Sequence, residues 1–101
     1  MRTRMPPSVR IGTTDFTIGR RKNGEDSGYF CVTCKPQISV RYGLPTGNAP
    51  TVLVHEIVHA GCYEYGINLR ESQIDGMTHV FLQLIRNNPE LIDYLIKTKQ
   101  P

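Results

Sequence analysis

One short segment, His55-Glu56-Ile57-Val58-His59, constrains this chain more than any other feature of its sequence. It lies in an apolar stretch, and we expect a helix over residues 50–65. Proline at position 50 suits the first helical turn, and glycine at position 66 suits the end. Residues four apart leave the same face of a helix. The segment therefore predicts that His55 and His59 bind one Zn²⁺ ion through ring nitrogens.

Glu56 follows His55 and lies about 100° further around the same helix. A carboxylate there can take a proton from a water molecule whose pKa zinc lowers to about 7. Its apolar neighbours predict burial, and a buried carboxylate without a partner is costly. The alternative is two core histidines bonded to the backbone, with Glu56 at the surface. We expect the catalytic arrangement, with Glu56 as the general base.

A catalytic zinc ion needs a third protein ligand, which we expect on a second helix over residues 69–87. The short connection 66–68 makes the two helices antiparallel neighbours. We expect Glu71 to be the ligand and Asp75 to hydrogen-bond the other ring nitrogen of a zinc histidine. The other candidates are His79, one turn beyond Asp75, and Cys62 on the first helix.

Two considerations keep the choice of third ligand open. In a strictly antiparallel pair of helices, Asp75 and not Glu71 lies level with His59. Asn68 and Glu71 also fit the spacing of a capping box, which would occupy the glutamate at the helix end. The apolar residues of this second helix recur at helical spacing, so we expect them to face the core. They are Ile74, Met77, Phe81, Leu84 and Ile85.

Short strands are expected in the first half of the chain, over residues 9–11, 15–19, 29–33 and 37–42. Asn23-Gly24 is a typical hairpin turn between two of them. Asn88 followed by Pro89 predicts the start of a third helix. Strands followed by helices indicate an α+β fold, with N-terminal antiparallel strands, the motif helix and two further helices. The 101 residues suit a single domain over 1–101.

The composition indicates where the protein is located and which classes of partner it binds. No apolar run approaches the roughly 20 residues that span a bilayer, and no signal peptide is recognisable, so we expect a cytoplasmic protein. The net charge is +3 with one basic cluster, Arg20-Arg21-Lys22, which makes a nucleic-acid partner unlikely. Three cysteines are expected to stay reduced. Cys31-x-x-Cys34 has no matching second pair, so we interpret both as strand residues and not as half of a metal site.

The motif resembles that of the small HExxH proteins encoded by bacteriophages and prophages. The residues 55–60, the segment 63–67, the pair Glu71 and Asp75, and the segment 88–91 carry this resemblance. Such proteins look like minimal zincins of the gluzincin type, distantly similar to ImmA/IrrE and SprT-like metallopeptidases. The resemblance implies zinc on the two histidines and Glu71, and a location in the host cytoplasm. It also implies that the strand 37–42, with Ser39, Val40 and Arg41, pairs with an extended substrate.

Two functions follow from these expectations. The first is a zinc-dependent metallopeptidase that hydrolyses a peptide bond of a protein or peptide substrate. The second is a non-catalytic, zinc-stabilised protein that acts by binding a host or phage protein. Glu56 distinguishes them, because a structural zinc site gains nothing from a carboxylate beside the metal.

Overall fold

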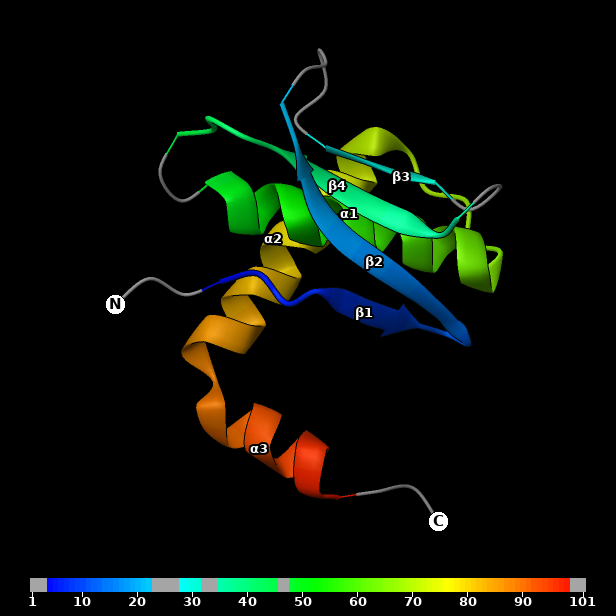
Figure 1. Cartoon of the computed structure of the whole chain (residues 1–101). Coiled ribbons are helices and arrows are strands. Elements are labelled where there is room, and N and C mark those ends of the chain that lie inside the picture. The colour runs from blue at the N-terminus through cyan, green and yellow to red at the C-terminus, as the bar shows by residue number, and fades with distance from the viewer. Residues whose placement is uncertain (1–3, 23–27, 32–34, 46–47, 99–101) are drawn as a thin grey trace.

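The computed structural model describes residues 4–22, 28–31, 35–45 and 48–98. They form an α+β fold in which a sheet precedes three helices (Figure 1). The strands are β1 (Ser8–Ile11), β2 (Thr14–Arg21), β3 (Gly28–Cys31) and β4 (Gln37–Arg41). The helices are α1 (Asn48–Tyr65), α2 (Glu71–Asn87) and α3 (Pro89–Lys97). The α+β prediction is therefore confirmed, with the helices in the expected order.

The sheet is mixed, and not antiparallel throughout as the sequence predicts. Its strand order is β1-β2-β4-β3. β1 pairs with β2 and β3 with β4 in antiparallel fashion, but β2 and β4 are parallel, with Ile18 opposite Ile38. The predicted hairpin between β2 and β3 is wrong for these strands because β4 lies between them; its turn, Asn23-Gly24, falls outside the described residues. Burial explains the arrangement, since Ile38, Ser39 and Val40 are all buried, as expected of a central strand.

The core lies between the sheet and α1. Phe16, Ile38 and Ala60 are fully buried there, and Ile11 closes the cluster beneath Leu53 and Ile57 of α1. α1 packs on β1, β3 and β4, so it crosses the sheet (Figure 1). This packing holds one side of the motif helix against the sheet and leaves another side for α2.

α1 ends, and α2 begins, within about two residues of the predicted positions. Gly66 has a positive φ of 66°, a conformation that glycine adopts without strain, and ends α1 as expected. α2 begins at Glu71 and not at residue 69, and the expected Asn68 cap does not form. Instead, the backbone N–H of Arg70 donates to Oε1 of Gln73 at 2.8 Å. Because Gln73 makes this cap, the side chain of Glu71 is not used to cap the helix.

The apolar face of α2 is only partly covered. Ile74 is 1% exposed and packs toward the interior, as predicted. Met77, Phe81 and Ile85 are exposed, so the prediction that they face the core is wrong. The reason is that α3 turns away from the sheet and packs on α2 alone among the described elements (Figure 1). None of the described helices is long and apolar enough to cross a membrane.

Candidate metal centre

Three side chains from two helices meet where the beginning of α2 passes α1. His55 and His59 leave α1 one turn apart, and their Nε2 atoms lie 3.2 Å from each other. Oε1 of Glu71, the first residue of α2, lies 2.7 Å from Nε2 of His55 and 3.2 Å from Nε2 of His59. In the described part of the chain, these residues form the one group of three or more metal-ligating side chains.

The spacing of the three atoms fits a small divalent cation. Two ligands held at 2.0–2.1 Å in a tetrahedral site lie about 3.3 Å apart. The two longer separations, both 3.2 Å, agree with that value, and the separation of 2.7 Å opens with a small side-chain rotation. Two imidazoles and a carboxylate form a donor set found in catalytic zinc sites. The residues present therefore fit a metal ion.

Asp75 lies one turn beyond Glu71 and contacts the far side of the first histidine. Its Oδ1 is 3.0 Å from Nδ1 of His55. A proton on Nδ1 donates to this carboxylate, and that tautomer leaves the lone pair of Nε2 directed at Glu71 and His59. The side chain expected to orient a ligand histidine is thus in contact with one.

The electrostatics of the cluster favour an ionised Glu71. Burial raises the pKa of its carboxyl group, but the hydrogen bond and the charge of His59, together with the charge of His55, outweigh burial. The pKa of Glu71 is therefore below its ordinary value. Its side chain is 64% exposed, while those of His55 and His59 are 21% and 27% exposed, so solvent reaches the cluster from the carboxylate side.

Glu56 is buried, with 7% of its surface exposed, and its side chain leaves α1 toward β3. A Cβ atom at Gly28 of β3 would lie 3.1 Å from Cγ of Glu56 and 2.6 Å from Cγ1 of Val52. The glycine thus lets the sheet edge approach the helix at the glutamate. Gly28 could not be recognised from the sequence, because a glycine beside a strand indicates only a turn or a bulge.

The remaining candidates for the third ligand lie elsewhere. His79 lines a hollow with Thr51, Leu82 and Arg86 on the far part of α2. Cys62 is a half-buried thiol and is not part of the metal-ligating group. Cys31 ends β3, half-buried, and Cys34 falls outside the described residues. Of the four candidates, Glu71 is the one that the structure brings to the Nε2 atoms of both histidines, while Asp75 contacts Nδ1 of His55.

The predicted substrate-pairing residues Ser39, Val40 and Arg41 lie in a central strand. β4 pairs with β2 along one edge and with β3 along the other. Its backbone cannot take up an added strand, so this prediction is corrected. Among the described strands, β1 and β3 are the two edge strands, and both contact α1.

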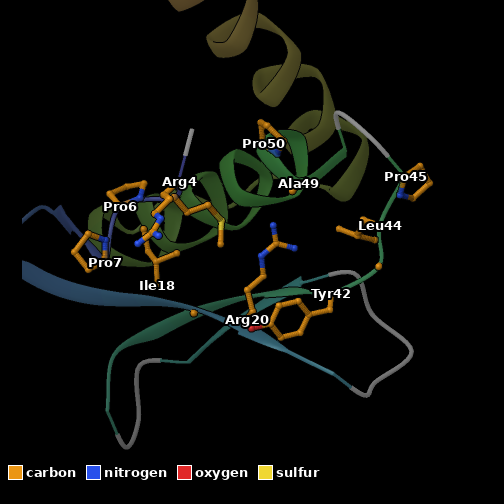
Figure 2. Close-up of a pocket in the computed structure, with 13 residues that line it drawn as sticks. Arg4, Pro6, Pro7, Ile18, Arg20, Tyr42, Leu44, Pro45, Ala49 and Pro50 are labelled. Carbon is orange, nitrogen blue, oxygen red and sulfur yellow. The ribbon is translucent and has the colours of Figure 1, made fainter. Parts of the chain in front are cut away.

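A hollow on another part of the protein is separate from the histidine cluster. It has a volume of about 1000 Å³ and lies between the N-terminal segment, the ends of β2 and β4 and the start of α1 (Figure 2). Arg20 extends into it, over the ring of Tyr42 at 5.5 Å, and donates to the carbonyl of Arg41. None of the metal-ligating residues lines it.

Comparison of the chain with protein-family models, with curated proteins and with solved structures finds no match.

Proposed function

We propose that this protein is a zinc-dependent metallopeptidase of a minimal, zincin-like kind. The observation that carries the proposal is the convergence of His55 Nε2, His59 Nε2 and Glu71 Oε1 within 3.2 Å of one another. Two further features support it. Asp75 holds one imidazole from behind, and the cluster is open to solvent on the side of Glu71. A structural zinc site has four protein ligands, whereas a catalytic site has three.

Each residue then has a distinct role. His55, His59 and Glu71 hold the ion, and Asp75 fixes the tautomer and orientation of His55. A bound zinc ion supplies a water molecule of lowered pKa and polarises the substrate carbonyl. Glu56 would act as the general base toward water on such an ion and would return the proton to the leaving amine. Glu56 adjoins His55 in sequence and is buried, as the sequence predicts.

An extended peptide substrate fits β3 better than β4. β3 is the edge strand nearest Glu56, since Gly28 lies against the side chain of that glutamate. A peptide paired with the outer edge of β3 would gain backbone hydrogen bonds and pass beside the general base. The resemblance to phage-encoded proteins is the ground for placing this activity in a host cytoplasm.

The test compares zinc-loaded wild-type protein with its Glu56→Gln variant. Each is incubated with a peptide mixture made by digesting a bacterial lysate, and mass spectrometry identifies new peptide ends. We expect the wild type to produce cleavage products and the variant to bind the same amount of zinc but produce none. If the variant cleaves as fast as the wild type, the assignment of Glu56 is wrong. If neither cleaves and both are stabilised by zinc, the non-catalytic binding function replaces the peptidase.

A further inference from the structure

Apolar side chains gather on the solvent-facing side of α2 and α3. α2 buries only Ile74 and Thr78, and α3 has no buried residue. Eight large apolar side chains of these helices are between 38% and 69% exposed. We call them the α2–α3 apolar surface: Met77, Val80, Phe81, Ile85, Leu91, Tyr94, Leu95 and Ile96.

Most of this surface continues the side of α2 that carries Ile74 and Thr78, further along the helix, because Phe81 and Ile85 lie two turns beyond those buried residues. Ile74 and Thr78 point toward α1, on the side that also carries Glu71 and Asp75. Val80 lies two residues beyond Thr78, and two residues advance a helix by about 200°. It therefore faces away from α1. Phe81 and Ile85 lie about 9 and 15 Å further along α2 than Asp75, so an occupant of this part of the surface would be centred away from Glu71 and Asp75.

The surface is too large to be incidental. About half of each of the eight side chains is exposed. At roughly 150 Å² for a fully exposed large apolar side chain, the exposed area is on the order of 600 Å². Monomeric proteins rarely expose contiguous apolar patches larger than a few hundred Å², whereas each partner of a stable interface buries about 800 Å². A nine-residue helix such as α3 also has little stability of its own in water. The summed exposed area of these side chains thus approaches, without reaching, what one partner of a stable interface buries.

We propose that the α2–α3 apolar surface binds the same surface of a second copy of this chain, forming a twofold symmetric dimer. The segment from Arg86 to Lys97 carries two positive and two negative residues, so it is neutral although the whole chain is +3. Two copies can meet there without charge repulsion. A twofold dimer places one patch against itself, and an uncharged apolar patch is complementary to itself.

The charges on α3 argue against a membrane as the occupant. Helices that lie on membranes usually carry lysine and arginine on the polar face. The polar residues of α3 are Glu90, Asp93 and Lys97, and the last two pair with each other at 3.1 Å. Two carboxylates and one ammonium group give this helix no attraction to anionic lipids.

Sedimentation velocity of the full chain over a range of micromolar concentrations tests the proposal. We expect a dimer that dissociates on dilution. Ile85→Glu and Leu95→Glu each place a charge in the contact and are expected to raise the dimer dissociation constant by about a hundredfold. Both side chains are more than half exposed, so neither change removes a core contact. The matched control is Ile67→Glu, since Ile67 is 52% exposed and Ile85 55%, and Ile67 lies outside the surface.

Three results would overturn the proposal. The first is a wild type that sediments as a monomer at the highest concentration. The second is a dimer that Ile67→Glu weakens as much as Ile85→Glu does. The third is a monomer that co-sediments with vesicles of anionic phospholipid, which would assign the surface to a membrane. Far-UV circular dichroism establishes that each variant is folded, so that a loss of dimer is not a loss of structure.

Discussion

Oδ1 of Asp75 lies 3.0 Å from Nδ1 of His55, on the side of the ring opposite Glu71. This contact links the two helices through one imidazole, because His55 belongs to α1 while both acidic residues belong to α2. The two carboxylates contact opposite nitrogens of the His55 ring and so restrict its orientation. The position of α2 along α1 therefore determines the geometry of the cluster of His55, His59 and Glu71.

We expect Asp75→Ala to weaken zinc binding by about 10- to 100-fold, because His55 loses the partner that fixes its tautomer. Asp75→Asn should lose less, since the amide oxygen still accepts a hydrogen bond from Nδ1. Competition with a zinc-binding dye measures both affinities. Asp93→Ala on α3 is the control, since that carboxylate pairs only with Lys97 among the contacts described. Equal affinities for Asp75→Ala and Asp93→Ala would remove Asp75 from the site.

The purified protein should contain about one equivalent of zinc, and His55→Ala, His59→Ala and Glu71→Ala should each lose it. A site with three protein ligands retains little affinity with two. His79→Ala should keep its metal, because that histidine lies in a different hollow on α2. Elemental analysis of the freshly purified variants gives the answer. Zinc retained by the Glu71→Ala variant, or lost by the His79→Ala variant, would contradict the ligand set.

Gly28 and Gly19 both lie in strands, but they differ in how closely other atoms pack against them. A Cβ atom at Gly28 would lie 2.6 Å from Cγ1 of Val52 and 2.9 Å from the carbonyl oxygen of Ser39, whereas one at Gly19 meets nothing within 4 Å. Gly28→Ala must push β3 away from α1, and we expect a loss of about 1–3 kcal/mol in the free energy of unfolding.

Gly19→Ala should be neutral or stabilise the protein by up to about 1 kcal/mol, because alanine restricts the unfolded chain. Urea titration of both variants measures the difference. Gly28→Ala should also lower any peptidase activity, since it moves the edge strand beside Glu56. An unchanged stability of Gly28→Ala would mean that β3 does not pack closely on α1.

The stability of the metal-free protein should depend on pH through the ionisation of Glu71. Its pKa is lowered in the folded state, since hydrogen bonding and charge from the two histidines outweigh burial. A carboxyl group with a lowered folded-state pKa adds stability above its unfolded pKa and loses this contribution as the pH falls through its folded pKa. The effect is small because the side chain is 64% exposed.

We therefore expect chelator-treated wild type to be more stable than Glu71→Gln above about pH 5, and this difference to shrink on acidification. Urea titrations of both proteins in a series of acidic buffers measure it. Stability curves that stay parallel down to the acid transition would show that the carboxylate contributes nothing to the metal-free fold.

The sequence by itself determined the local parts of this protein. The order of strands and helices, the end of α1 at Gly66 and the shared face of His55 and His59 follow from residue preferences and from the helical repeat. These features depend on residues a few positions apart, so they can be read without knowing the fold. The same reasoning left four candidates for the third ligand, because their distances from the histidines depend on how two helices cross.

Tertiary structure decided the rest. Gln73 rather than Glu71 accepts the hydrogen bond that caps α2, and the crossing of the helices brings Glu71 to the imidazoles. β4 enters the sheet between β2 and β3, so the strand nearest in sequence to the motif helix is not the edge strand. Phe81 and its neighbours follow a core pattern yet face solvent, since the periodicity of a helix shows which side is apolar but not what covers it. Pairings between distant segments are set by the packing of the whole chain, and no local pattern encodes them.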